Sequence, residues 1–174
     1  MPKDAERDKT GGTPFQKELV SMDTIFETLQ KTASRLNETA DSANELIRTA
    51  NERLGAMGAG VAFASDKWVL REERFTHYDE GRDREEDAGY SAYVLSYAKI
   101  HGTWQLGVQK QRYMPGTGNI VGDYNLAGSE DEPLLSADRE LRIEAASMLP
   151  DFLGEYTAHL AKLADRLSQP KQKN

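Results

Sequence analysis

Three histidines, His77, His101 and His159, are the side chains best suited to metal binding or proton transfer near neutral pH. Each stands apart from the others. His101 precedes Gly102 in an expected turn, and His159 follows Glu155 by four positions on an expected helix. A metal site needs several histidine or carboxylate ligands that converge, and no such spacing occurs around them. The sequence therefore predicts no metal site.

Acidic side chains between residues 72 and 87 are a second candidate for chemistry. A pair of carboxylates can carry out acid–base catalysis or hold magnesium. These residues occupy an expected strand end and a charged segment, 79–88, where charge usually serves solvation. We therefore predict no catalytic residue among them. They are Glu72, Glu73, Asp79, Glu80, Asp83, Glu85, Glu86 and Asp87.

The glycines of segment 116–122 have the superficial spacing of a phosphate-binding loop. A genuine loop of that kind follows a strand and opens a helix, whose N-terminus meets the phosphate. Here no helical pattern follows before Pro133, and no P-loop lysine follows the glycines. The chain also has no G-x-S-x-G nucleophile motif and no cysteine. We expect a connecting loop and no cofactor, and an enzymatic role is the less favoured interpretation.

The element that dominates the chain is a series of apolar residues spaced alternately by four and three. Such a series predicts one long helix, residues 14–57, with a narrow apolar stripe that another helix or a sheet must cover. Pro14 suits the first helical position, and a second helix starting at Ser42 is the alternative. The stripe consists of Phe15, Leu19, Met22, Phe26, Leu29, Ala33, Leu36, Ala40, Ala43, Ile47, Ala50, Leu54 and Met57.

The rest of the chain predicts a sheet followed by helix. Apolar residues alternate along 90–100 and again along 103–113, so these segments predict an antiparallel hairpin around His101 and Gly102. We place an antiparallel sheet at 60–113, with the charged segment 79–88 as a loop within it. A second loop is expected at 114–133.

Helical periodicity resumes over residues 134–168, where Pro150 either kinks one helix or separates two. Residues 1–13 are expected to be a disordered arm and 169–174 a tail. The prediction is one α+β domain over residues 14–168. In it, the long N-terminal helix and the C-terminal helix, or kinked helix pair, pack with a three- or four-stranded antiparallel meander.

The flanks of the stripe indicate what covers it. In the heptad set by Leu19 as an a position, the e positions are mostly Asn and Gln and the g positions are Ile25, Thr32, Thr39, Leu46 and Arg53. A dedicated zipper usually places complementary charges there, while Ile25 and Leu46 widen the apolar face as in a bundle. Two interpretations stay open: an internal pair with the C-terminal helix, and self-association, including a homodimer.

Composition limits the partners. The net charge of −7 argues against duplex nucleic acid as a direct partner, because phosphate binding requires a concentrated basic surface. No segment approaches the roughly 20 apolar residues of a membrane helix, so no membrane partner is expected. The N-terminus has no apolar signal region, and the expected location is the cytoplasm.

The sequence thus favours a non-enzymatic protein–protein interaction or oligomerisation module. Its helices would mediate association with itself or another protein, and its sheet or acidic loop would contact a partner. The alternative is a small-ligand-binding or hydrolytic domain with a site between the sheet and the 114–132 loop. The residues expected to mediate interaction are Leu19, Phe26, Leu29, Leu36, Ile47, Leu54, Trp104, Arg112 and Tyr113.

Overall fold

The structure is a computed structural model that describes residues 14–79, 84–115 and 124–168. Side chains are described at residues 22–74, 89–115 and 124–168. The predicted arm at 1–13, the predicted tail at 169–174 and the glycine-rich segment 116–122 lie outside the described residues.

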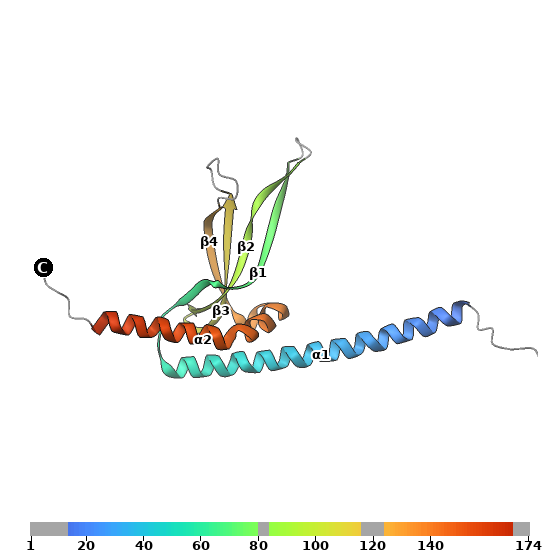
Figure 1. The fold of residues 1–174 in the computed structure, drawn as a ribbon, viewed down its shortest axis with the longest axis horizontal. Coiled ribbons are helices and arrows are strands. Elements are labelled where there is room, and N and C mark those ends of the chain that lie inside the picture. The colour runs from blue at the N-terminus through green and yellow to red at the C-terminus, as the bar shows by residue number, and fades with distance from the viewer. Residues whose placement is uncertain (1–13, 80–83, 116–123, 169–174) are drawn as a thin grey trace, which may run out of the picture. The chain divides into compact units, whose positions relative to one another are not determined.

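The structure has two long helices and a four-stranded antiparallel sheet whose strand order is β1-β2-β3-β4 (Figure 1). This arrangement confirms the predicted α+β fold, with a long N-terminal helix, a C-terminal helix and an antiparallel meander. The elements in order are α1 (Pro14–Met57), β1 (Phe63–Asp79), β2 (Arg84–Ile100), β3 (Thr103–Pro115), β4 (Tyr124–Pro133), a short 3-10 turn (Leu134–Ser136) and α2 (Arg139–Ser168).

Helix α1 is continuous over 44 residues, and the alternative start at Ser42 is wrong. Its C-terminus follows from Gly58, whose φ of 62° lies in the left-handed region. The Gly58 N–H donates to the carbonyl of Gly55 at 3.2 Å, which satisfies one of the helix's last carbonyls. Glycine adopts this conformation without the steric cost of a Cβ, so the helix ends here.

The hairpin of β2 and β3 is confirmed. His101 and Gly102 have φ values of 50° and 84°, so both central turn residues have the positive φ of a type I′ turn. Pairing runs without a register shift from Ile100 opposite Thr103 to Tyr90 opposite Tyr113.

Two predicted loops are wrong in part. β4 occupies the second half of segment 114–133, and β1 and β2 extend into the charged segment, where Asp79 pairs with Arg84. Neither stretch alternates between apolar and polar residues, so the sequence does not reveal them as strands. In β4 the reason is exposure, since it is an edge strand whose residues 125–132 are exposed. Backbone pairing with β3 holds it in the sheet, and its acidic side chains discourage further strand addition.

Helix α2 runs through Pro150 as one element, which settles the alternative of two helices. Ser147, just before Pro150, donates from its Oγ to the carbonyl of Glu144 at 2.7 Å within the helix and so does not cap a second helix. Pro150 is exposed, and it lacks the N–H that would otherwise bond the carbonyl four residues earlier.

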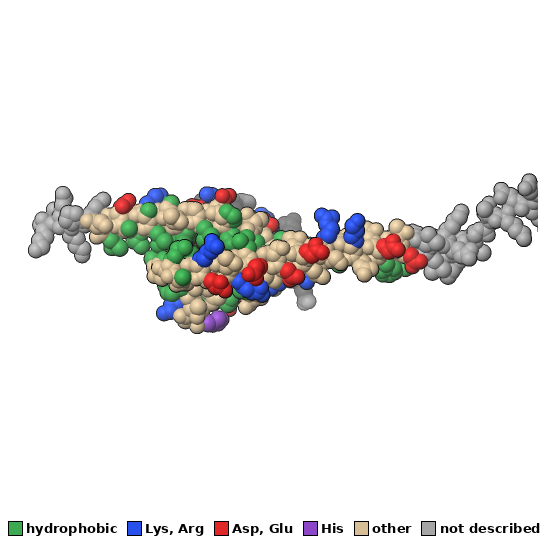
Figure 2. Space-filling view, turned by 90° about the horizontal axis from the view of Figure 1, so that it is seen from below, with side chains coloured by type: hydrophobic (Ala, Val, Ile, Leu, Met, Phe, Trp, Pro, Cys, Tyr) green, Lys and Arg blue, Asp and Glu red, His purple; other side chains and the backbone are tan. Residues whose placement is uncertain are grey.

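The chain divides into two compact units, Met1–Thr39 and Ala40–Asn174. The second unit holds a hydrophobic core in which α2 and the part of α1 from Ala40 share one face of the sheet. Figure 2 shows apolar side chains gathered between the two helices. The prediction of a single domain over 14–168 stays a prediction. Fully buried members of the core include Ile47, Leu95, Tyr97, Leu106, Val108, Leu134, Leu149 and Phe152.

Candidate functional site

The described part of the apolar stripe of α1 is exposed from Met22 to Leu36 and buried from Ala40 to Leu54. Every described side chain from Met22 to Thr39 is exposed. The large apolar ones are Met22 (51%), Ile25 (53%), Phe26 (60%), Leu29 (57%) and Leu36 (45%). The same heptad then continues through Ala40, Ala43, Ile47, Ala50 and Leu54, all of which are at most 8% exposed. One stripe therefore supplies both a core-forming face and an uncovered apolar face.

The predicted interaction residues on α1 divide accordingly. Phe26, Leu29 and Leu36 lie on the uncovered face, and Leu19 lies in the helix at a position whose side chain is not described. Ile47 and Leu54 belong to the core of the second unit. An association role for any of these residues stays a prediction.

Threonines beside the exposed stripe satisfy their hydroxyl groups within the helix. Thr32 donates to the carbonyl of Thr28 at 2.8 Å. Thr39 donates in the same way to Arg35 at 2.9 Å. A hydroxyl that is already bonded loses little when a partner covers it. These flanks are therefore compatible with a buried interface.

A second feature is a row of charged residues on the face of the sheet that also carries the core. We call Arg71, Glu73 and Lys110, which surround Tyr93, the charged row. Arg71 of β1 and Lys110 of β3 both pair in register with Tyr93 of β2. Their cationic groups lie 4.6 Å and 5.3 Å from the centroid of the Tyr93 ring, within cation–π range. The Tyr93 hydroxyl donates to Glu73 at 2.8 Å. Tyr93 thus contacts two cationic groups and one carboxylate on the same face of the sheet.

Arg71 also reaches the start of α2. Its Nη1 lies 2.9 Å from Oδ2 of Asp138, and its Nε lies 3.0 Å from Glu73. Asp138 caps the helix, because its Oδ1 accepts the backbone N–H of Leu141 at 2.9 Å. That hydrogen bond, opposed by partial burial and aided by Arg71, lowers the pKa of the Asp138 carboxyl below its usual value.

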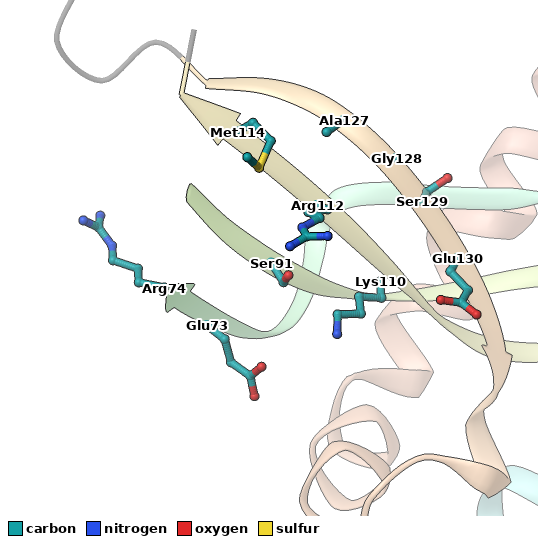
Figure 3. Close-up of a pocket in the computed structure, with 10 residues that line it drawn as sticks. All are labelled: Glu73, Arg74, Ser91, Lys110, Arg112, Met114, Ala127, Gly128, Ser129 and Glu130. Atoms are coloured by element: carbon teal, nitrogen blue, oxygen red, sulfur yellow. The ribbon is translucent and has the colours of Figure 1, made fainter. Parts of the chain in front are cut away.

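Beyond this row the same face of the sheet forms a depression of about 920 Å³ (Figure 3). A β-bulge in β4 shapes its rim, since Arg112 pairs with Gly128 while Tyr113 pairs with Leu126. Lys110 has no ion-pair partner within 4 Å among the described residues, so it is available to an acidic group. The lining residues are Glu73, Arg74, Ser91, Lys110, Arg112, Met114, Ala127, Gly128, Ser129 and Glu130.

The opposite face of the sheet carries tyrosines and glutamines. Tyr90 and Tyr113 stack with ring centroids 4.7 Å apart, and Tyr124 meets Tyr90 edge-on at 5.2 Å. The Tyr113 hydroxyl donates to Gln111 at 2.8 Å, Gln111 donates to Gln109 at 2.8 Å, and Gln109 donates to Asp131 at 3.3 Å. Burial raises the pKa of Tyr113, as do the nearby carboxylates of Asp66 and Glu72, so its hydroxyl keeps the proton that it donates.

The three predicted interaction residues of the sheet lie apart. Trp104 is half-buried, with its ring centroid 5.7 Å from that of Tyr97. Arg112 lines the depression, and Tyr113 lies on the opposite face because neighbouring strand residues alternate. The structure does not bring these three together.

Sequence reasoning missed Asp138 and Arg71. Asp138 directly precedes the helical pattern of α2, which is an N-cap signal that a closer reading could have found. Arg71 has no local signal, since its partner is distant in the sequence.

The histidines do not form a site. His101 is exposed in its turn, and the ring of His159 lies 5.2 Å from that of Phe63. Glu155 pairs with Lys67 at 3.2 Å. The His77 side chain lies outside the described residues. Across the described side chains, no group of three or more histidines and carboxylates is arranged to hold a metal ion.

No helix in the described ranges is long and apolar enough to cross a bilayer. Comparisons with protein families, curated proteins and solved structures find no match to this chain.

Proposed function

We propose that this chain is a non-enzymatic association module, which joins a partner through the exposed part of the α1 stripe, residues 22–36. The observation that carries the proposal is the exposure of five large apolar side chains, each between 45% and 60%, on one helix. Burying such a side chain stabilises a complex by about 1.5–3 kcal/mol. An isolated helix is only marginally stable in water, so contact with another helix also stabilises this segment.

The charged side of the sheet supplies the second part of the proposal. Lys110 and Arg112 lie beside Glu73 and Glu130 around the depression. Mixed charges of this kind suit the polar rim of a protein interface, and arginine is enriched among the residues that dominate binding energy. We propose that this face contacts a partner protein. A cytoplasmic location, expected from the cysteine-free sequence, belongs to the same proposal.

Sedimentation velocity over a range of concentrations tests the association. The wild-type chain is expected to sediment as a dimer or larger, and the double variant Phe26→Asp/Leu29→Asp as a monomer. Both residues are exposed, so circular dichroism is expected to show a retained fold. The matched control, Thr28→Asp/Ser34→Asp, adds the same charge to exposed positions off the stripe and should still associate. A wild-type chain that stays monomeric at every concentration contradicts self-association through this stripe.

A small-ligand site is the second candidate, because the depression is lined both by the sheet and by the described part of segment 114–132. Its cationic groups, Lys110 and Arg112, suit a small anion. Thermal denaturation with a panel of nucleotides, phosphates and carboxylates tests it, since a ligand of the folded state raises the melting temperature. A shift that disappears in Lys110→Gln supports this candidate, and no shift across the panel removes it.

A further inference from the structure

We infer that the partner of the exposed α1 stripe is a second copy of this chain, and that the two helices pair antiparallel, with Phe26 of one copy opposite Leu29 of the other. This inference rests on the proposed association and names its partner and geometry. It uses only the segment from Met22 to Leu36, which lies within the first compact unit.

The sizes of the stripe residues favour the antiparallel arrangement. In a heptad with Leu19 at a, Phe26 and Ala33 are a positions, while Met22 and Leu29 are d positions. Antiparallel helices pack a against d, so Met22 meets Ala33 and Phe26 meets Leu29. A parallel pair in register would instead place Phe26 against itself and Ala33 against itself. Alternating large and small residues fills layers evenly, whereas a layer of two alanines leaves space.

The charges along the helix favour the same direction. Asp23 and Glu27 make the start of the exposed segment acidic, and Lys31 and Arg35 make its later part basic. A parallel partner in register would set acidic beside acidic and basic beside basic. In the antiparallel arrangement the acidic start of each segment lies level with the basic part of the other, so attraction replaces repulsion. The net charge of the whole chain, −7, acts equally in both arrangements.

The e and g positions, which flank the stripe, allow the two helices to approach each other closely. In the proposed register Ile25 lies beside Thr32 of the other copy, and Asp23 lies beside Gln30. The Thr32 hydroxyl is already bonded to the carbonyl of Thr28 at 2.8 Å, so contact with Ile25 buries its methyl group without leaving a polar atom unpaired. No like-charged pair stands at these e and g positions.

The other antiparallel register, one heptad further along, fits less well. It would place Met22 opposite Ala40, which is only 5% exposed and belongs to the packed part of the helix. The register centred between Glu27 and Thr28 uses exposed residues alone.

Engineered cysteines test direction and register, because the chain contains no cysteine of its own. A disulfide requires Cα atoms about 4.4–6.8 Å apart. Residues 22 and 33 of one helix are about 16 Å apart at a rise of 1.5 Å per residue, so they cannot join within one chain. In the proposed pair, Met22→Cys of one copy meets Ala33→Cys of the other.

The full-length double variant Met22→Cys/Ala33→Cys is therefore expected to form a covalent dimer in a non-reducing gel after mild oxidation. Each single variant is expected to stay uncrosslinked, and an equimolar mixture of the two single variants should yield a crosslinked heterodimer. Lys31→Cys, an exposed position on the outer side of the helix, is the matched control and should give no crosslink.

Other results overturn the inference in distinguishable ways. Crosslinking of Met22→Cys alone would mean that the helices pair in parallel, and crosslinking only in Phe26→Cys/Leu36→Cys would mean the other antiparallel register. A wild-type dimer with no crosslink in any variant would place the interface elsewhere, so the inference would fail while association stands. A wild-type chain that is monomeric by sedimentation would remove self-association, and this inference with it.

Discussion

Arg71 of β1 and Asp138 at the start of α2 form an ion pair in which Nη1 and Oδ2 are 2.9 Å apart. The other carboxylate oxygen of Asp138 caps the helix by accepting the Leu141 N–H. One carboxylate thus orders a helix terminus and joins that terminus to the first strand. The same arginine continues, through its contact with the Tyr93 ring, into the charged row of the sheet.

Substitution of Asp138 separates these two roles. Asp138→Ala removes the cap and the ion pair, and loss of a cap alone typically costs about 0.5–2 kcal/mol. Asp138→Asn keeps an oxygen that can accept the Leu141 N–H and loses only the charge. Because Asp138 is half-exposed, the ion pair contributes at most about 1 kcal/mol. In urea denaturation, the free energy of unfolding should therefore be highest for the wild type, lower for Asp138→Asn and lowest for Asp138→Ala. Equal values for the two variants would show that capping contributes nothing.

The Asp138 carboxyl also predicts a pH dependence. Its pKa is lower in the folded chain than its ordinary value of about 3.9, so the stability that it contributes is present above that value. That contribution is lost as the pH falls through the lowered pKa. The difference in unfolding free energy between wild type and Asp138→Asn should be constant near neutral pH and shrink below about pH 4. A difference that grows on acidification would contradict this sign.

Gly107 is expected to tolerate no side chain. A Cβ added there would lie 2.5 Å from Cδ1 of Ile100 and 2.9 Å from the backbone carbonyl of Glu132 on β4. Since that carbonyl belongs to the paired edge strand, Gly107→Ala should lower the unfolding free energy by about 1–3 kcal/mol. Gly128→Ala is the control, because nothing lies within 4 Å of the added atom. Thermal melts that are lowered equally by both variants would refute the steric explanation.

The two halves of the α1 stripe should respond differently to truncation. Ile47 is fully buried, so Ile47→Ala should lower the unfolding free energy by about 2–5 kcal/mol. Leu29 is 57% exposed, and Leu29→Ala should change the stability of the isolated chain by no more than about 0.5 kcal/mol while weakening association. Urea denaturation at low protein concentration, compared with sedimentation at high concentration, measures the two effects. A large loss of stability in Leu29→Ala at low concentration would mean that the exposed half already packs within one chain.

The elements that follow from local patterns were predictable. The heptad from Met22 to Leu54 repeats often enough to define a single helix across the polar stretch at 37–44, and His101 and Gly102 between two alternating segments define a hairpin. The sequence does not show that burial of the helix begins at Ala40, because burial depends on residues distant in the sequence that pack against this part of the helix.

Elements that depend on distant partners were not predictable. β4 has neither alternation nor apolar residues in number, and it exists because the edge of β3 offers unpaired backbone groups. Pro150 looked like a boundary, yet the packing of Leu149 and Phe152 on the core holds the helix together on both sides of it. The sequence suggests Trp104, Arg112 and Tyr113 as interaction residues, but Trp104 packs against the core, Arg112 lines the depression, and Tyr113 lies on the opposite face.

The side chains from Tyr113 to Asp131 have a further consequence. A carboxylate accepts hydrogen bonds and donates none, so Gln109 must turn its amide nitrogen toward Asp131. Its carbonyl oxygen then faces Gln111, which must turn the same way, and the Tyr113 hydroxyl completes the series. A single negative charge at the sheet edge thereby orients two amides and a phenol. All three hydrogen bonds on this face donate toward that edge, a polarity that the strand pairing alone does not impose.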